Sequence, residues 1–169
     1  MISVHGGLDC DLLQSPGWFD LMKNTQDEAY TKSATFPGRF ESLAKIAEFV
    51  TRAAEAAGFD AREVYAVQLA VDEACSNIIQ HAYGGESQGT IECTCRVVPE
   101  ALVIILKDHG RSFDPDAVPE PNLEAPLEER EGGNLGLYFM HQLMDEVRFD
   151  RTPDSFNVLT MIKRREETA

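Results

Sequence analysis

The spacing of apolar residues changes several times along the chain, and each change predicts a new element. From Phe36 onward, apolar residues recur three and four positions apart, which is the spacing of a helix with one buried face. The residues of this stripe are Phe36, Phe40, Leu43, Ile46, Ala47 and Val50. We expect this helix to end near Gly58, because glycine is a common residue at helix C-termini.

A second helix is predicted over residues 61–82. Asp60 is suited to be its N-cap, and Glu63 stands three residues later, where a capping box requires an acid. The stripe expected to face the core comprises Val64, Val67, Val71, Ala74 and Ile78. A glycine pair at 84–85 follows the end of this helix.

The second half of the chain is predicted to contain two strand pairs and one helix. Residues 90–98 and 101–108 have strand-like composition and a short turn between them, which is typical of an antiparallel pair. Residues 132–147 begin with a glycine turn and continue with helical spacing. Residues 146–152 and 155–164 have the pattern of a final hairpin.

An irregular loop is expected between the two halves. Residues 114–131 contain four of the chain's eight prolines and a run of carboxylates. A loop of this length is usually either functional or disordered.

The order of these elements predicts an α+β fold, in the form of a two-layer α/β sandwich. Its mixed, mainly antiparallel sheet would be covered on one face by helices. We expect an N-terminal extension of unknown function over residues 1–33, one domain over residues 34–165, and a polar tail over residues 166–169.

Composition narrows the classes of function. The chain has 169 residues, of which 43% are apolar, and this suits one globular domain. Its formal net charge of −14 argues against direct binding to nucleic acid, which requires clustered Lys and Arg. No apolar run approaches the roughly 18 residues of a membrane span, and no secretory signal is recognisable, so we expect a cytoplasmic protein without membrane contact.

The four cysteines lack the spacing of a metal site or a redox motif. They are Cys10, Cys75, Cys93 and Cys95. Cys93 and Cys95 alternate within a predicted strand and would share one face. We expect reduced thiols in or near the core.

The predicted second helix carries a polar row beside its apolar stripe. Glu73, Asn77 and His81 are four residues apart, so they lie along one line of the helix, about a quarter turn from the core stripe. Such a row is also typical of the solvent face of an amphipathic helix. We interpret His81 as a structural residue that caps or braces the helix end.

Two further motifs favour a nucleotide site, although a simple turn would also explain each of them. Asp108 directly follows a predicted buried strand, and an ionised carboxylate only accepts hydrogen bonds. It would therefore select an amino group, such as that of adenine, over the carbonyl of guanine. The sequence EGGNLGL, residues 131–137, opens a helix, and glycine amides at a helix start can hold phosphates.

Together these motifs predict a site for ATP and magnesium. Asn77 offers an amide oxygen to the metal ion, and Glu73 would orient or deprotonate the attacking nucleophile. The chain contains neither the P-loop motif nor the motif set of ordinary protein kinases. The site would therefore belong to another class of ATP-binding protein.

Three segments resemble the motifs of the GHKL ATPase superfamily, which has the Bergerat ATP-binding fold. DEACSNIIQHAY resembles its asparagine box, DHGRSFDP its first glycine box, and GGNLGLYFMHQLMDEV its second. The amino-acid sequences of these three boxes are most similar to those of the anti-sigma-factor serine/threonine kinases of that superfamily. The resemblance covers about residues 34–165.

The resemblance implies a role for each matching residue. Glu73 matches the catalytic carboxylate, Asn77 the magnesium-binding asparagine, and Asp108 the adenine-binding aspartate. Residues 115–131 match the ATP lid. The other nucleotide-binding positions implied are Gly110, Gly132, Gly133, Asn134, Gly136 and Leu137. Asn134 stands where many members have glycine, and asparagine tolerates the positive φ of such a turn better than most residues.

The resemblance implies an ATP-dependent protein kinase with Mg2+ as cofactor. Such a kinase phosphorylates a serine or threonine of an anti-sigma-factor antagonist of the STAS type and sequesters a sigma factor by partner switching. A homodimer is a further assembly that the resemblance implies. The alternative is a nucleotide-binding partner-switching protein without productive kinase activity. A histidine-kinase catalytic domain and a gyrase-like ATPase are disfavoured, because we find neither a phosphoacceptor helix pair nor a transducer domain.

Overall fold

The computed structural model describes residues 30–118, 122, 124 and 132–166. These residues form one five-stranded sheet and three α-helices. The strands are β1 Thr31–Pro37, β2 Thr90–Val98, β3 Ala101–Asp108, β4 Glu146–Arg151 and β5 Asn157–Arg164. The helices are α2 Ser42–Ala56, α3 Ala61–Asn77 and α4 Gly132–Leu143.

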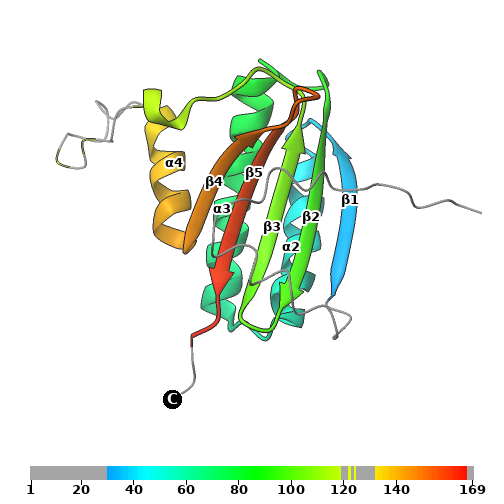
Figure 1. The fold of residues 1–169 in the computed structure, drawn as a ribbon, viewed down its shortest axis with the longest axis vertical. Helices are drawn as coiled ribbons and strands as arrows, with labels where there is room; N and C mark the ends of the chain where they lie inside the picture. The colour runs from blue at the N-terminus through cyan, green and yellow to red at the C-terminus, as the bar shows by residue number, and fades with distance from the viewer. Residues whose placement is uncertain (1–29, 119–121, 123, 125–131, 167–169) are drawn as a thin grey trace, which may run out of the picture.

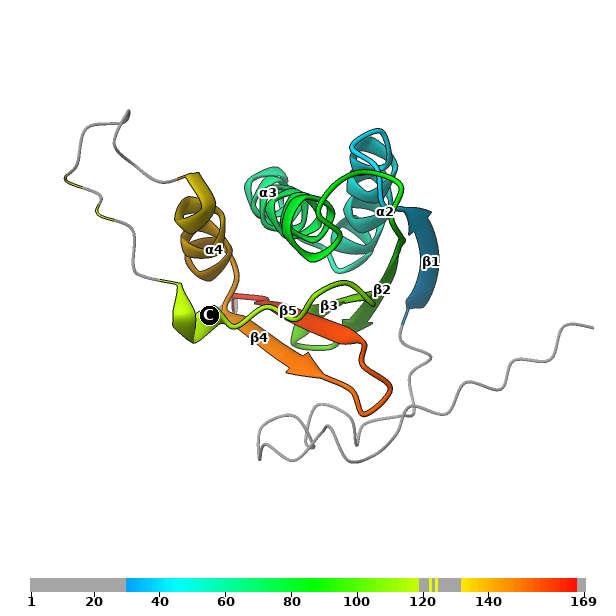
Figure 2. The same ribbon diagram turned by 90° about the horizontal axis from the view of Figure 1, so that it is seen from above.

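The sheet and the helices make two layers. The strand order is β1-β2-β3-β5-β4, and every strand pair in the described residues is antiparallel. All three helices lie on the same face of the sheet, with α3 between α2 and α4 (Figure 1, Figure 2). The predicted two-layer α+β fold is confirmed. The sheet is simpler than predicted, because its described pairs include no parallel one.

The main core lies between the sheet and the helices. Alternate residues of the central strand β3 face this core, among them Leu102, Ile104 and Leu106, all fully buried. From the helix layer, Val67 and Val71 of α3 fill the opposing side. This packing fixes α3 across the sheet, and the polar row of α3 is thereby held beside α4.

The start of α3 is determined by a local motif that the sequence predicted. The Asp60 carboxylate accepts a hydrogen bond from the Glu63 backbone N–H at 2.8 Å, and the Glu63 carboxylate accepts one from the Asp60 N–H at 2.9 Å. This is a complete capping box, which satisfies two backbone donors at the helix start.

The end of α3 is less regular than predicted. The last predicted turn, Ile78–Ala82, is a π-helix, and the Tyr83 N–H donates to the Ile78 carbonyl at 2.9 Å. Short π-helical segments occur often at functional sites. Here Ile78, His81 and Ala82 of the segment line the pocket that is described below.

The first predicted helix begins later than expected, and the prediction of a helix from Phe36 was wrong. Phe36 belongs to strand β1 and pairs with Ile91 of β2. Its ring contacts Phe49 of α2 edge-on, with centroids 5.8 Å apart. The residue therefore packs against the helix that follows, although it is not part of it. The predicted end of α2 is confirmed, since Gly58 adopts a φ of +80° there.

The remaining strands match their predictions closely. The pair 90–98 and 101–108 forms β2 and β3, and the final hairpin forms β4 and β5. Residues 1–29 of the predicted N-terminal extension lie outside the described residues, as do 167–169 of the predicted tail. Within the described residues, no helix is long and apolar enough to cross a membrane.

Three cysteines have the surroundings that the sequence predicted. Cys75, Cys93 and Cys95 are buried in the main core and form no disulfide. Burial raises the pKa of the Cys75 thiol, and the charge of Asp72 raises it further. The Cys93 pKa is raised by its hydrogen bond with Cys95 and by burial. Cys10 lies outside the described residues.

Candidate functional site

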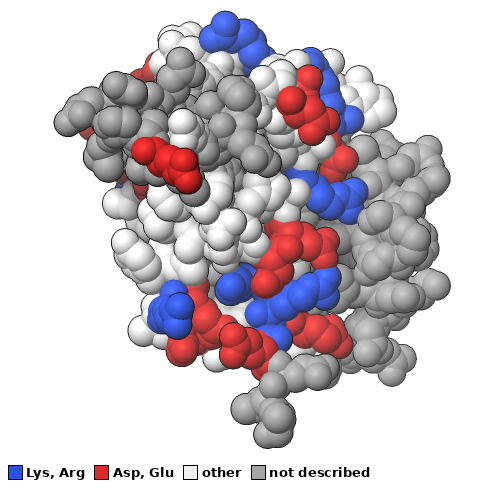
Figure 3. Space-filling view, turned by 90° about the vertical axis from the view of Figure 1, so that its left-hand side faces the viewer, with Lys and Arg blue, Asp and Glu red and all other residues white. Residues whose placement is uncertain are grey.

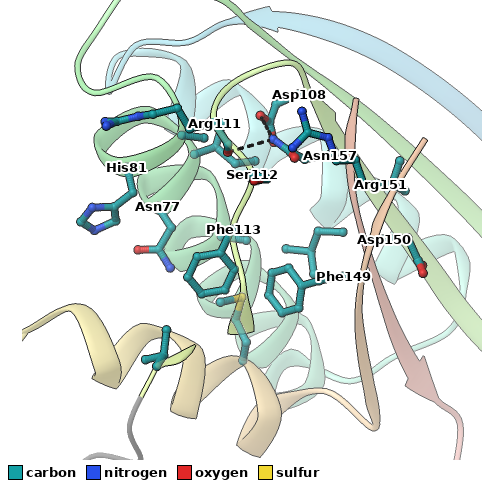
Figure 4. Close-up of a pocket in the computed structure, with 17 residues that line it drawn as sticks. Asn77, His81, Asp108, Arg111, Ser112, Phe113, Phe149, Asp150, Arg151 and Asn157 are labelled. Atoms are coloured by element: carbon teal, nitrogen blue, oxygen red, sulfur yellow. Dashed lines mark hydrogen bonds between the residues drawn. The ribbon is translucent and has the colours of Figure 1, made fainter. Parts of the chain in front are cut away.

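A pocket of about 570 Å³ opens where α3, β3, α4 and the final hairpin meet (Figure 4). It is lined by two of the predicted site residues, Asn77 from α3 and Asp108 from the end of β3. Phe113 and Phe149 form an apolar wall, with ring centroids 5.2 Å apart. A pocket with apolar walls and a few convergent polar groups is the usual form of a small-molecule site.

Among the described residues, Asp108 is the only buried charged side chain, with 5% of its surface exposed. Its Oδ1 accepts hydrogen bonds from the Gly110 N–H and from Asn157 Nδ2, each at 2.8 Å. Within the described residues, Oδ2 has no hydrogen-bond partner. The side chain lines the pocket, so Asp108 offers an oriented acceptor to a ligand that carries a donor.

Gly110 makes the close contact that joins this turn to α3. A Cβ on Gly110 would lie 2.6 Å from the carbonyl carbon and oxygen of Ala82, where real Cβ atoms are not found. The neighbouring Arg111 N–H donates to the same Ala82 carbonyl at 2.8 Å. Glycine is therefore required for the turn after β3 to contact the end of the π-helix. This contact sets the position of Asp108 relative to Asn77.

A tyrosine supports the same turn from outside the pocket. The Tyr83 hydroxyl donates to the Thr90 carbonyl at 2.6 Å, and it accepts a hydrogen bond from the His109 N–H at 3.3 Å. Burial raises the pKa of Tyr83, and the nearby charge of Asp108 contributes in the same direction. Tyr83 therefore remains a protonated donor near neutral pH.

Glu73 and Asn77 lie one turn apart on α3 and face α4. A Cβ on Gly136 of α4 would lie 2.7 Å from Glu73 Oε2 and 3.5 Å from Asn77 Nδ2. Asn77 lines the pocket, and the half-buried Glu73 lies just outside it, between α3 and α4. The structure thus brings three predicted site residues, Glu73, Asn77 and Gly136, into one small volume.

The glycine-rich segment differs from its prediction. Helix α4 begins at Gly132, so Gly132, Gly133 and Asn134 form its first turn, and the predicted glycine turn before the helix was wrong. Gly136 lies inside the helix, where its lack of a side chain leaves room for Glu73. The Asn134 side chain is not among the described side chains.

The surroundings of two other residues singled out in the sequence are also described. His81 is exposed and lines the pocket, and among the described residues it has no hydrogen bond that would cap or brace the helix end. Leu137 is partly buried and packs against the main core. Of the predicted lid, Pro115–Ala117 form a 3-10 turn, and residues 119–121, 123 and 125–131 lie outside the described residues.

Sequence reasoning missed several residues of the pocket. Asn157 contacts Asp108 directly, and Phe113, Phe149 and Arg151 line the cavity. Phe113 stands within the quoted segment DHGRSFDP, and its position after the Asp108 turn was a signal for it. Asn157 and Phe149 carry no local signal, because only the antiparallel pairing of β5 with β3 and β4 brings them to the site.

The surface beside the site carries charges of both signs. On the face that includes α4 and β4, basic and acidic side chains lie next to one another and form no separate basic patch (Figure 3). Glu146 of β4 pairs with Arg164 of β5, and Arg148 lies 3.7 Å from Asp150. Such a surface offers no field of one sign to a nucleic-acid backbone.

The residues present fit a magnesium ion that is held jointly with a nucleotide. The described residues include no group of three or more His, Cys, Asp or Glu side chains suited to hold a metal ion alone. Magnesium usually keeps several waters and takes only one or two protein oxygens besides substrate phosphates. Asn77, with Glu73 one turn away, supplies a donor set of that size.

Comparison with known proteins gives a consistent result. The histidine kinase-like ATPase domain matches residues 36–163. The serine-protein kinase RsbW of Halalkalibacterium halodurans is 31% identical over 79% of this chain and 82% of the relative. The Bacillus subtilis serine-protein kinase RsbW is 33% identical over 75% of this chain and 80% of the relative.

A solved structure has the same fold. The RsbU and RsbW domains of a Mycobacterium tuberculosis protein match with a TM-score of 0.56 and 14% sequence identity. The match covers 81% of this chain and 33% of that chain. At this identity the likeness concerns the fold alone.

Proposed function

The chain belongs to the histidine kinase-like ATPase family, and from this premise we propose that it is an ATP-dependent protein serine kinase. Its substrate would be a serine or threonine of an anti-sigma-factor antagonist, and it would also sequester a sigma factor. The proposal rests on the family and on the residues that the fold brings together.

One observation carries the catalytic part of the proposal. The carboxylate of Glu73, the amide of Asn77 and the backbone of Gly136 meet beside a pocket that also contains Asp108. A protein that only binds nucleotide needs an acceptor for the base and a place for the phosphates. It does not need a half-buried carboxylate one turn from the metal-binding amide, and that carboxylate favours a kinase over a binding module.

One end of the pocket would bind the adenine base and the other end the phosphates. Asp108 accepts a hydrogen bond from the adenine amine, and the rings of Phe113 and Phe149 provide an apolar wall for the base. The triphosphate extends toward Asn77 and the first turn of α4, where backbone N–H groups favour anions. This orientation places the γ-phosphate near Glu73.

Glu73 acts on the acceptor hydroxyl. Its carboxylate accepts the hydroxyl proton as the serine oxygen attacks the γ-phosphorus, and the bond from that phosphorus to the ADP oxygen breaks. Gly136 leaves the carboxylate free to approach, because no side chain fills the space beside it. When bound, magnesium would neutralise charge on the phosphates, with Asn77 as its protein ligand.

The partners are part of the proposal. We infer a STAS-type antagonist as substrate, a sigma factor as the sequestered protein, a possible homodimer, and a cytoplasmic protein without direct nucleic-acid or membrane contact. The alternative function is a partner-switching protein that holds nucleotide without transferring phosphate. The presence of Glu73 beside Asn77 favours the kinase.

Two variants separate these functions. Glu73→Ala should retain ATP and partner binding but lose phosphotransfer by ~10²–10⁴-fold, which is the usual contribution of a positioned general base. Asn77→Ala should lose phosphotransfer and also the magnesium-dependent part of ATP affinity. Transfer of labelled γ-phosphate to an antagonist protein and calorimetric ATP titration, with and without magnesium, measure both properties.

Asp72 of α3 and Gln80 of the π-helical segment after it provide matched controls. Asp72 and Gln80 are exposed and do not line the pocket, so Asp72→Ala and Gln80→Ala should leave both properties unchanged. A wild type that binds ATP but labels no antagonist, together with an unaltered Glu73→Ala variant, would establish the alternative function instead.

A further inference from the structure

Asn157, at the start of β5, lies outside the three sequence motifs but makes several polar contacts beside the pocket. Its Nδ2 donates to Asp108 Oδ1 at 2.8 Å and also lies within hydrogen-bonding distance of two backbone carbonyls of the turn after β3. The carbonyls are those of Gly110, at 3.2 Å, and Arg111, at 3.1 Å. One side chain thus joins the acid to the turn that follows it (Figure 4).

We propose that Asn157 is a positioning residue that fixes the Asp108 carboxylate and makes recognition of the adenine amine depend on it. This inference rests on the proposed function, because it assumes that the pocket binds ATP. It adds a specificity-determining residue outside the three motif segments of the sequence.

The orientation of the Asn157 amide follows from its neighbours. Three oxygen atoms surround Nδ2, and an amide oxygen in that place would face three acceptors without a proton to share. The NH2 group therefore points to Asp108 and the turn, and Oδ1 points away from them. A rotation of the amide that turned its NH2 group toward the base would break these three contacts.

The strand pairing makes this arrangement rigid. Asp108 and Asn157 are direct partners in the antiparallel register of β3 and β5. Both side chains line the pocket, and Asp108 Oδ1 is occupied by Gly110 and Asn157. The remaining oxygen, Oδ2, is consequently held in one direction, as an acceptor for the base.

Selectivity follows from this pair. The Asp108 carboxylate, held by Asn157, only accepts hydrogen bonds, so a base with an amino group is favoured and a base with a carbonyl there is disfavoured. Without Asn157, the carboxylate could rotate toward water, and the distinction between an amine and other groups would weaken. The loss should concern the amine specifically, not the triphosphate.

The experiment compares three nucleotides on the full chain. ATP and purine riboside triphosphate differ only by the amine, and GTP carries a carbonyl at that position. Calorimetric titrations with magnesium are done on wild type, Asn157→Ala, Asn157→Asp and Asn157→Ser. Thr160→Ala is the matched control, because Thr160 is a buried polar residue of the same strand that does not line the pocket. Thermal unfolding of each variant reports on folding.

Wild type should prefer ATP to purine riboside triphosphate. Asn157→Ala and Asn157→Asp should reduce this preference by ~10- to 100-fold, the effect of losing a hydrogen bond to a charged group. Their affinity for purine riboside triphosphate should change little. Asn157→Ser keeps one hydrogen-bond donor, so its preference for ATP should lie between those of wild type and Asn157→Ala. It can be compared with wild type if the other variants fold poorly. Thr160→Ala should keep the wild-type ratio.

Two results would overturn the inference. If the Asn157 variants bind all three nucleotides more weakly by the same factor, the residue only stabilises the strand. If the variants bind as wild type does, with the same preference for ATP, the residue has no part in recognition. A wild type that binds no ATP would instead refute the proposed function, and this inference with it. Wild-type ATP binding with unchanged ratios in the variants refutes this inference alone.

Discussion

Replacing Gly136 by alanine tests whether the contact between α4 and Glu73 matters for catalysis. The new methyl group would lie 2.7 Å from Glu73 Oε2, whereas ordinary contact begins at 3.4 Å, so one of the two must move by about 0.7 Å. Oε2 is the end of a flexible side chain, and α4 is held by its packing against the core. We therefore expect the carboxylate to move and the helix to stay.

The expected consequences for stability and for catalysis differ in sign. Alanine is favoured over glycine inside a helix by about 1 kcal/mol, which offsets the small cost of moving Glu73. The unfolding temperature should consequently stay near that of wild type or rise. A misplacement of about 1 Å in a catalytic site can cost ~10²-fold in rate, so phosphotransfer should fall by about that factor.

A double-mutant cycle with Glu73→Ala isolates the contact. The four proteins are compared by rate of γ-phosphate transfer, by ATP affinity and by thermal unfolding. In the Glu73→Ala background, Gly136→Ala should have no further effect on the rate, because the group that it displaces is absent. ATP affinity should change little in all four, since Glu73 does not line the pocket.

Two outcomes would refute this reasoning. Full phosphotransfer by Gly136→Ala would mean that the exact place of the carboxylate is unimportant. An equal loss in both backgrounds would mean that the methyl group acts on the nucleotide or on α4 itself and not through Glu73.

Three further predictions concern other parts of the chain. Asp108→Asn should weaken ATP binding by roughly 1–3 kcal/mol, the cost of misaligning a hydrogen bond to a charged group, and equal loss for GTP in titrations would contradict its role with the amine. Asp60→Ala removes the capping box of α3 and should lower the free energy of unfolding by about 1 kcal/mol in urea, while Asp72→Ala should not. The raised pKa of the Cys75 thiol means that the native state keeps a proton which the unfolded chain loses above its ordinary value of 9.0, so stability falls as pH rises past that point. In Cys75→Ala the free energy of unfolding, measured by urea denaturation at several pH values above 9.0, should fall less steeply, by about 1.4 kcal/mol per pH unit. The same slope in wild type and variant would contradict this prediction.

Local patterns in the sequence were sufficient for much of the fold. The capping box at Asp60 involves residues three positions apart, and the β2–β3 hairpin follows from strand-like composition and a short turn, so both could be predicted. Strand β1 could not, because it exists through pairing with a strand far along the chain. Phe36 matched a helical period by its apolar character alone, and residues 38–41 separate its strand from α2.

The candidate site was predictable where a single segment carries its chemistry. Glu73 and Asn77 share one helix, and Asp108 stands at a strand end, so local spacing was enough to expect them near one another; the structure has Asn77 and Asp108 in one pocket and Glu73 at its edge. Asn157 and the space around Gly136 depend on how β5 meets β3 and how α4 meets α3. Such contacts are set by tertiary packing, and no local pattern specifies them.

Glu73, positioned beside Asn77, is proposed to act as the general base when phosphate is transferred from ATP to a serine of a partner protein. The most direct measurement is intact-mass analysis of an antagonist protein after incubation with ATP, magnesium and either wild type or Glu73→Ala, with ATP binding confirmed for both. We expect the antagonist to gain one phosphoryl group with wild type and none with the variant over the same time. A wild type that binds ATP and the antagonist yet leaves its mass unchanged, or a variant that phosphorylates it equally fast, would contradict the claim.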